Sequence, residues 1–371
     1  MAKKAYVGVS SKSRLLKNIY VGVNGVAKKV VKAYVGVNGK ARQIWPKSAS
    51  WPTYYKKTYP LSYRCSELAS ANLEPYAIFC DLVGVVAIAI NTSLSGTSVD
   101  GLIGSAARSG MGITSIGNYA LFVGGQNSGV NTAVDAYDTS LTHQEFRLDG
   151  SGGGNLGATT LGNYAIFAGA YRSSHTYSDA FTFNKSLTYS ESISNLSSSR
   201  HSSKGVTIGN SYAVFGPGWL RTSRYNKGNT AVDAYNSSLT LTTLESVTSV
   251  DTPYPAASLG NRAVFLSYGQ AADVYNSSLT RTYYATFTSG TPNDYSYPGT
   301  CINGFMMVPL SNNTIDIFNE SLTKQTITGF YSDGRTKWGA NHVGDYALFV
   351  AGTISDGDTN TNQYDMFVYR T

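Results

Sequence analysis

Residues 161–170 read LGNYAIFAGA and residues 116–125 read IGNYALFVGG, so nearly the same ten residues occur twice at a spacing of 45. The core of this phrase is a Tyr, a small residue, an apolar residue and a Phe. Looser copies follow one another along most of the chain. The copies begin at Tyr76, Tyr119, Tyr164, Tyr212, Arg262, Phe305 and Tyr346. One structural unit of 41 to 50 residues is therefore repeated seven times.

A second phrase keeps the same spacing as the first. Its clear copies are VDAYDTSL (134–141), VDAYNSSL (232–239), ADVYNSSL (272–279) and IDIFNESL (315–322), its weaker copies are AIAINTSL (87–94) and AFTFNKSL (180–187), and YDMFVYRT (364–371) is a seventh. In the first six, an Asn or Asp stands three residues before a Leu. Since Asn and Asp favour turns, each copy predicts a strand followed by a turn.

The two phrases together predict four strands in each repeat. A Gly-Asn pair between two β-favouring runs is typical of a tight hairpin turn. The YAIFA run is short and apolar, as expected of a strand buried on both faces. The Asp-x-Tyr run alternates apolar and polar residues. We expect the strands at the run before Gly-Asn, at Tyr-Ala-x-Phe, at Asp-x-Tyr and at Ser-Leu-Thr.

The two ends of the repeat region predict a closed ring. A four-stranded unit of this size must stack on its neighbours to bury its faces. The seventh repeat stops after its third strand, whereas WPTYYKKTYPLS at 51–62 resembles the fourth-strand segment TRTYYATFTSG at 280–290. The fold class is therefore all-β, with a seven-bladed β-propeller over 53–371. We expect strand 53–62 to pair with the C-terminal blade and remove the exposed edges.

The layout of each repeat is similar to that of kelch-type propellers. Kelch blades have an apolar strand ending in Gly-Gly, a loop, an aromatic strand and a turn, and YALFVGG and VDAYDTSL follow this order. The Gly doublet is intact only at Gly124-Gly125, and the Trp expected after the aromatic strand is missing. The resemblance implies a kelch-like propeller in which the loops between strands two and three share a face with the loops between blades.

The first 50 residues differ in charge from the rest. They hold eleven Lys and Arg and no Asp or Glu, which leaves 29 − 11 = 18 basic against 22 acidic residues elsewhere. AYVGV (5–9), IYVGV (19–23) and AYVGV (33–37) recur every 14 residues, and the last two precede Asn-Gly. Because Asn-Gly is a strong hairpin signal, we predict a module of basic β-hairpins over 1–45 and a linker at 46–52.

Tandem YVGVNG-type units ahead of a larger C-terminal domain resemble those of structural proteins of phages and prophages. The resemblance implies a virion protein, such as a tail fibre or baseplate component, that is made in the host cytoplasm and whose propeller binds a host-surface glycan or protein. The basic repeats would contact other virion proteins or further copies of the chain. The alternatives are a capsid decoration or head-fibre protein, or an intracellular bacterial scaffold that holds a protein partner.

No catalytic or metal-binding pattern is apparent in the sequence. Its four His lack metal-ligand spacing, and no nucleophile elbow or phosphate loop occurs. The recurring Asp (Asp135, Asp233, Asp273, Asp316 and Asp365) suits a structural role in turns. The chain is accordingly predicted not to be an enzyme and to need no cofactor or metal, with calcium near Asp356 and Asp358 as the weaker alternative.

The remaining sequence features bear on compartment. Cys65, Cys80 and Cys301 are too few for a disulfide framework, and neither a secretory signal nor a membrane-spanning stretch is present. The Asn-x-Ser/Thr triplets are therefore interpreted as turns and not as glycosylation sites. The basic repeats could attract nucleic acid, but without interleaved aromatic residues a solvated or inter-subunit face is favoured.

Two segments between second and third strands contain the candidate ligand-binding residues. GPGWLRTSRYNKGNT at 216–230 and YRSSHTYS at 171–178 combine aromatic rings with multidentate donors, which is the chemistry of glycan and protein recognition. The alternative is two ordinary loops whose aromatic residues pack locally. The candidates are Trp219, Arg221, Arg224, Tyr225, Tyr171, Arg172 and Tyr177.

Overall fold

A computed structural model describes most of the propeller region and the strands of the N-terminal region. The described residues are 6–9, 12–15, 20–23, 26–29, 33–37, 40–45, 51–58, 68–81, 87–99, 101, 108–126, 132–148, 152–221, 226–248, 255–267, 270–290, 299–310, 314–329, 339–350 and 365–370. All regular secondary structure among them is β-strand or isolated β-bridge, joined by turns and bends, with no helix. Within this part of the chain, then, nothing helical is available to cross a bilayer.

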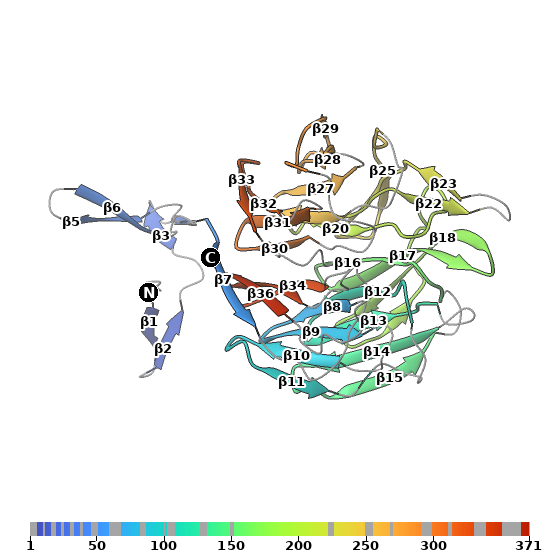
Figure 1. Ribbon diagram of the computed structural model, residues 1–371, viewed down its shortest axis with the longest axis horizontal. Helices are drawn as coiled ribbons and strands as arrows, with labels where there is room; N and C mark the ends of the chain where they lie inside the picture. Colours follow the sequence, from blue (N-terminus) through green and yellow to red (C-terminus); the bar gives the residue numbers. More distant parts are fainter. Residues whose placement is uncertain are drawn as a thin grey trace. The chain divides into compact units, whose positions relative to one another are not determined.

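Residues 52–371 form seven four-stranded antiparallel sheets arranged around a ring (Figure 1). The first three blades are β8 (Leu68–Leu73), β9 (Tyr76–Asp81), β10 (Ala87–Asn91) and β11 (Gly96–Val99); β12 (Gly112–Ile116), β13 (Tyr119–Val123), β14 (Ala133–Asp138) and β15 (His143–Arg147); and β16 (Gly157–Leu161), β17 (Tyr164–Arg172), β18 (His175–Asn184) and β19 (Tyr189–Ser190).

The fourth to seventh blades have the same order of strands. They are β20 (Gly205–Ile208), β21 (Tyr212–Phe215), β24 (Asp233–Asn236) and β25 (Leu241–Thr243); β26 (Ala256–Leu259), β27 (Arg262–Leu266), β28 (Ala272–Tyr275) and β29 (Arg281–Tyr284); β30 (Thr300–Ile302), β31 (Phe305–Leu310), β32 (Thr314–Asn319) and β33 (Lys324–Thr328); and β34 (Gly339–Val343), β35 (Tyr346–Val350), β36 (Asp365–Arg370) and β7 (Thr53–Thr58). The all-β, seven-bladed fold class is confirmed.

The repeated aromatic phrase marks the second strand of every blade. All seven positions at which the phrase begins are also the first residues of β9, β13, β17, β21, β27, β31 and β35. The preceding Gly-Asn pair forms a two-residue hairpin loop, as where Ile116 pairs with Tyr119 and Leu161 with Tyr164. Gly117 and Gly162 have φ of 58° and 60°, which glycine adopts without steric penalty.

The prediction that Ser-Leu-Thr forms the fourth strand was wrong. In six blades this segment belongs to the turn before the fourth strand, as the left-handed backbone of its Leu, with φ of 60–63°, shows. The preceding Asn or Asp carboxyl or amide oxygen accepts bonds from two backbone N–H groups, two and four residues later, at 2.8–3.1 Å. The fourth strand begins beyond the Leu, as at His143 after Leu141.

The last blade contains strands from both ends of the chain. β36 pairs with β35 on one side and with β7 on the other, so that Arg370 lies opposite Thr53 and Asp365 opposite Thr58. The rest of the predicted closing strand, residues 59–62, lies outside the described residues. Because β7 supplies the fourth strand, the sheet of blade seven has the same size as the others.

The first strands of the blades contact one another in sequence around the ring, and β34 contacts β8 to complete it. Their penultimate residues are half-buried and six of the seven carry a hydroxyl, amide or imidazole group: Asn72, Ser115, Thr160, Thr207, Ser258, Cys301 and His342. Several of these side chains link adjacent blades. Asn72 Nδ2 donates to the His342 carbonyl at 2.8 Å, and the Thr207 and Ser258 hydroxyls lie 3.1 Å apart.

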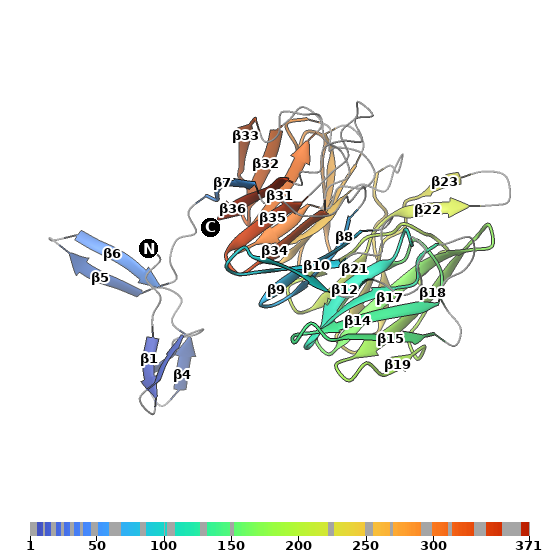
Figure 2. The same ribbon diagram turned by 60° about the horizontal axis from the view of Figure 1, so that its bottom comes forward.

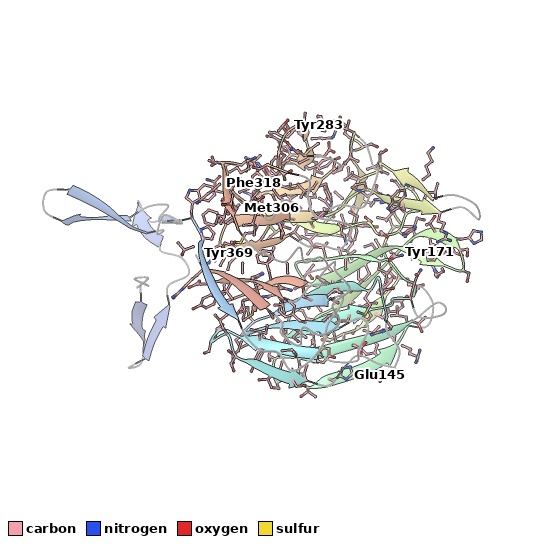
Figure 3. All side chains as sticks on the ribbon, viewed as in Figure 1. Glu145, Tyr171, Tyr283, Met306, Phe318 and Tyr369 are labelled. Carbon is pink, nitrogen blue, oxygen red and sulfur yellow. The ribbon has the colours of Figure 1, made fainter. Side chains whose placement is uncertain are left out.

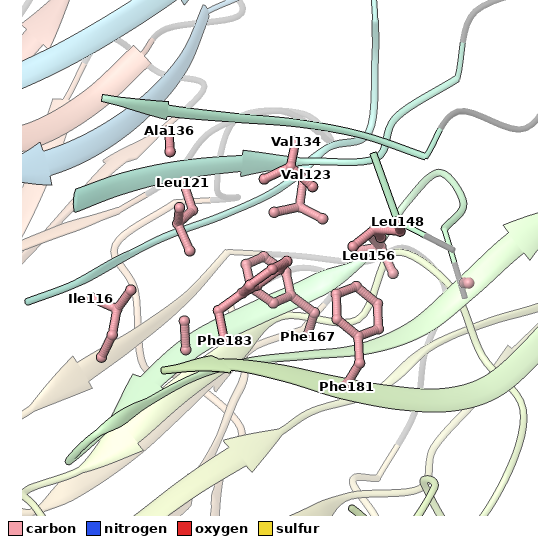
Figure 4. Packing of buried hydrophobic residues seen from close by; sticks show 12 residues of the cluster. Ile116, Leu121, Val123, Val134, Ala136, Leu148, Leu156, Phe167, Phe181 and Phe183 are labelled. Atoms are coloured by element: carbon pink, nitrogen blue, oxygen red, sulfur yellow. The ribbon is translucent and has the colours of Figure 1, made fainter. Parts of the chain in front are cut away.

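The hydrophobic core is divided into layers between neighbouring blades. Figure 4 shows one of these, in which Leu121 and Val123 of β13 face Phe167 of β17 and Phe183 of β18. Phe167 and Phe181 stack at 5.3 Å between ring centroids. The same pairing of a second-strand face with the next blade recurs around the ring. Each blade is therefore stable only as part of the ring.

Residues 1–51 form a separate compact unit. It contains three two-stranded antiparallel sheets: β1 (Tyr6–Val9) with β2 (Lys12–Leu15), β3 (Tyr20–Val23) with β4 (Val26–Lys29), and β5 (Ala33–Val37) with β6 (Lys40–Trp45). Each pairs a YVGV strand with a strand rich in basic residues. No pairing joins one hairpin to another within the described strands of this unit.

Candidate functional site

Two hairpins extend beyond the four-stranded sheets of blades three and four. In blade three, β17 and β18 continue past the sheet and turn at Ser173-Ser174. In blade four, β22 (Gly218–Arg221) and β23 (Asn226–Asn229) form an extra hairpin between the second and third strands. Both candidate segments therefore contain paired strands in their described parts, where the sequence predicted loops. Figures 1 and 2 both show the two hairpins side by side.

Backbone hydrogen bonds fix these hairpins to the ring. His201, in the segment before β20, and Trp219 exchange two backbone bonds of 2.9 Å. In blade three, Gly154 and Tyr171 exchange the equivalent pair at 3.1 and 2.9 Å. The hydroxyl of Thr176 reaches across to the carbonyl of Arg221 at 3.5 Å. We call the surface formed by Tyr171–Tyr177 and Gly218–Arg221 the ridge.

A glycine bulge brings the first hairpin toward the neighbouring blade. The β17–β18 register shifts between Ala168 and Ala170, and Gly169 between them has φ of 69°. A Cβ on Gly169 would lie 2.3 Å from the carbonyl oxygen of Arg200. Only glycine allows both the positive φ and this close approach, so the bulge seats the hairpin against the Arg200–His201 segment.

Arg221 and Tyr171 form the exposed part of the ridge. The Arg221 guanidinium lies over the Tyr171 ring, 5.1 Å from its centroid, although the two residues belong to different blades. Arg221 is exposed, and Tyr171 and Trp219 are half-buried. Figure 3 shows Tyr171 on the outer part of the β17–β18 hairpin. Two aromatic residues and one cation are thus accessible to a ligand.

Arg172 and Tyr177 hold the first hairpin together. The Arg172 guanidinium lies 4.0 Å from the Tyr177 ring centroid and pairs with the carboxylate of Asp179. Arg172 side-chain exposure is 18%. Because Asp179 already compensates its charge, Arg172 has a structural role in the hairpin. We therefore assign the contact with a ligand to Arg221.

His201 lies beneath the ridge and is buried. Its ring is 5.3 Å from the Tyr171 ring, and its Nδ1 is 2.9 Å from the Ser202 hydroxyl. Its Nε2 has no hydrogen-bond partner. Burial, with a smaller contribution from the Arg221 charge, lowers the pKa of His201 to about 4. The imidazole is therefore neutral at pH 7.

The ridge brings together five of the seven predicted residues, namely Trp219, Arg221, Tyr171, Arg172 and Tyr177. Arg224 and Tyr225 lie outside the described residues. His201 and Asp179 were not predicted. An arginine before a first strand recurs at Arg108 and Arg200, but no sequence pattern singles out His201, and only the tertiary structure places its ring against Tyr171.

The recurring aspartates are buried and paired with cations. Asp233 pairs with Arg200 at 2.7 Å and Asp273 with Arg281 at 2.7 Å, Asp135 pairs with Arg108, and Asp316 lies 3.7 Å from Lys324. The four carboxylates are fully buried. They also bond backbone amides, as Asp233 does with Ser197 N–H at 3.0 Å. The structural role predicted for these residues therefore depends mainly on cations of the same blade, which the sequence analysis did not anticipate. The side chain of Asp365 lies outside the described part.

Other nucleophilic or metal-ligating groups do not assemble into a site in the described part of the chain. No three His, Cys, Asp or Glu side chains there lie together as a metal would need. Burial raises the pKa of the Cys301 thiol to about 12, so this thiol is protonated and unreactive at pH 7. The calcium alternative at Asp356 and Asp358 falls outside the described residues.

Comparisons with known proteins identify the fold. No family model matches the sequence, and no curated protein matches it either. Among solved structures, a streptogramin B lyase has a TM-score of 0.62 and 13% identity, covering 85% of this chain and 97% of its own. A virginiamycin B lyase from Staphylococcus aureus has a TM-score of 0.59, and its catalytically inactive histidine-to-alanine variant with quinupristin has 0.61. Both are 11% identical and cover 86% of this chain and 100% of their own.

These neighbours overturn the prediction that the chain is not an enzyme, because all three are described as lyases. That prediction depended on the absence of short catalytic motifs. Residues that meet on one face of a propeller come from loops of different blades, so a short motif does not record them. At 11–13% identity the likeness shows the propeller fold alone. The kelch and phage parts of the sequence resemblance remain predictions.

Proposed function

We propose that the chain is a surface component of a phage particle, in a tail fibre, baseplate or capsid, and that its propeller recognises a host receptor or glycan through the ridge. The observation that carries this proposal is the placement of Arg221 over Tyr171. Two hairpins from adjacent blades, each fixed to the ring by backbone hydrogen bonds, present a cation and two aromatic residues on one surface. Such preorganised aromatic and arginine groups are the usual centres of binding surfaces.

The basic hairpins of residues 1–45 serve in this proposal as the attachment module. Isolated two-stranded hairpins are marginally stable in water, so we expect them to gain stability on other virion proteins or on further copies of the chain. The support is the sequence resemblance to phage structural proteins together with the eleven uncompensated basic residues. A chain lacking residues 1–51 should be absent from purified particles, as measured by mass spectrometry.

Adsorption of particles to host cells tests the role of the ridge. Trp219→Ala and Arg221→Ala should each slow adsorption about tenfold or more, the effect expected for a central binding residue. Arg147→Ala is the matched control, because Arg147 is an exposed arginine on β15 of another blade. If the particles carrying each of the three variants all adsorb as fast as particles with the parent chain, the ridge does not take part in host recognition. Recovery of a specific protein partner from prophage-free bacteria, with no chain in intact particles, would favour the scaffold alternative.

A second candidate is lyase chemistry at the ridge. It is favoured by the fold shared with streptogramin and virginiamycin B lyases, one of which is inactive without a histidine, and by the neutral His201 of this chain. It ranks second because a histidine with a pKa of about 4 is a weak base at neutral pH. Incubation with quinupristin tests it. A changed chromatographic elution with the parent chain but not with His201→Ala would support a lyase, and unchanged elution with both would exclude this substrate.

A further inference from the structure

We infer that the ridge binds an anionic saccharide, a sugar that carries a carboxylate or a phosphate, with the acid group on Arg221 and the sugar ring against Tyr171 and Trp219. The inference rests on the proposed recognition function of the ridge and specifies the ligand class. Three observations carry it: the charge of the two candidate segments, the lack of a recorded ion pair at Arg221 among the described residues, and the partial exposure of Tyr171 and Trp219.

The sequence charge of the two candidate segments, 171–178 and 216–230, is opposite to that of the propeller as a whole. Residues 171–178 and 216–230 contain four Lys and Arg and no Asp or Glu. The other residues of 51–371 contain 18 − 4 = 14 basic and 22 acidic residues. Of the four cations, Arg172 is compensated by Asp179, and the others favour an anion at these segments.

Arg221 is not among the arginines for which the structure records an ion pair, a property that it shares with Arg147, Arg262 and Arg370. Arg108, Arg172, Arg200 and Arg281 each pair with a carboxylate. In the described part of the chain no carboxylate is recorded within ion-pair distance of Arg221, and the recorded contact of its guanidinium is the Tyr171 ring at 5.1 Å. A guanidinium presents a fork of donors that matches a carboxylate or phosphate. Its exposed donors are thus available to the acid group of a ligand.

The aromatic residues favour a sugar over a polymer of phosphates. Tyr171 and Trp219 are half-buried, so each has part of its surface open to a ligand. Rings of this kind provide an apolar body and a polar tip at small entropic cost. Nucleic-acid binding would instead require many cations along a path of phosphates. Within the described residues, the ridge offers Arg221, and the adjoining strand β23 adds the exposed Lys227.

Calorimetry on the full chain with matched pairs of sugars tests the inference. The carboxylate arm compares 3′-sialyllactose with lactose, and the phosphate arm compares mannose 6-phosphate with mannose. In at least one arm the acidic sugar should bind about ten to a hundred times more tightly than its neutral partner, as a charge-assisted bond to arginine predicts. Binding should weaken as salt is raised.

Variants separate a specific site from general attraction. Arg221→Ala should abolish the preference for the acidic sugar, Arg221→Lys should keep part of it, and Arg147→Ala should leave it unchanged. Thermal unfolding of each variant establishes that the ring is intact. Equal affinity for both members of each pair, no binding of any of them, or no effect of Arg221→Ala would overturn the inference. Tighter binding of a dodecamer of deoxythymidine or of polyglutamate than of either acidic sugar would also overturn it.

The outcome is distinguishable from that of the proposed function. If Arg221→Ala slows adsorption of particles but no acidic sugar binds, host recognition stands and the ligand class is wrong. If an acidic sugar binds through Arg221 but adsorption is unaffected, the ligand class stands and host recognition by the ridge is wrong.

Discussion

At the scale of single residues, one side chain supports the turn after the third strand in six blades. Asn236 is representative: its Oδ1 accepts from the N–H groups of Ser238 at 2.9 Å and Thr240 at 3.0 Å. The turn also places Leu239 at φ of 60°, a conformation that is unfavourable for a residue with a Cβ. The Asn side chain therefore compensates for backbone strain, which explains why the phrase recurs with a fixed spacing.

Asn236→Ala should lower the free energy of unfolding by about 1–2 kcal/mol, because two backbone donors lose their acceptor and the strain at Leu239 remains. Chemical denaturation measures the change. Ser237→Ala is the control, since Ser237 is exposed in the same turn and its side chain makes no recorded hydrogen bond. Equal stability of the two variants would show that the turn does not depend on the side chain.

The pKa of His201 reports on the charge of the ridge. Arg221→Ala should raise it from about 4 but leave it below the usual 6.5, because burial is the larger cause of the shift and remains. NMR titration of the imidazole measures this. In the parent chain the unfolded state binds the proton first as pH falls below 6.5, so stability should fall by an amount on the order of 3 kcal/mol between pH 6.5 and 4. His201→Gln should remove this part of the pH dependence.

At the scale of one blade, a buried ion pair joins the segment before the first strand to the third strand. In blade four, Arg200 donates to Asp233 at 2.7 Å and to the carbonyls of Gly216 and Phe215 at 3.0 and 3.3 Å. Both charged side chains have no exposed surface. A buried pair of this kind is weak support for stability as a whole, but loss of one partner leaves an unpaired charge in the interior.

Arg200→Met should destabilise the propeller by about 3–5 kcal/mol, because the carboxylate of Asp233 is left buried without its cation. The double variant Arg200→Met with Asp233→Leu should be less destabilised than the single one, since no charge then remains. Thermal and urea unfolding measure both. A single variant as stable as the double would show that the pair carries no buried charge penalty.

At the scale of the whole molecule, the ring depends on one strand supplied from the N-terminal side. β7 pairs with β36 through six residues, and its removal would leave an unpaired edge on β36. Unpaired edges are sites of aggregation, and every blade relies on its neighbours to bury its faces. Closure is therefore a property of the complete propeller region, residues 52–371.

Two truncations that differ by a few residues test this closure. A chain that begins at Pro52 retains β7 and should unfold cooperatively at the temperature of the full chain's propeller. A chain that begins at Pro60 lacks β7 and should unfold at a lower temperature and aggregate. Differential scanning calorimetry and light scattering measure the outcomes. Equal melting temperatures for the two chains would contradict the role of β7.

The sequence by itself determined the number of blades, the second strand of each and the closed ring. These depend on local signals: Gly-Asn turns, short apolar runs and a repeat spacing that a four-stranded unit requires. It placed the fourth strands incorrectly, because the Ser-Leu-Thr turn depends on side-chain bonds that a strand pattern does not reveal. It also interpreted the two ridge segments as loops, whereas their hairpins are stabilised by contact with neighbouring segments.

Only the tertiary structure decided which residues meet. Arg221 reaches Tyr171, and Tyr171 reaches His201, across the boundary between two blades, and each pair is separated by 30 or more positions in the sequence. The cations that compensate the buried aspartates likewise come from two different places in the blade, a preceding segment or a fourth strand. Repeats in a sequence encode the contacts that every blade shares. The contacts that make the ridge different from the rest of the ring arise because two neighbouring blades pack together and bring unlike residues into contact.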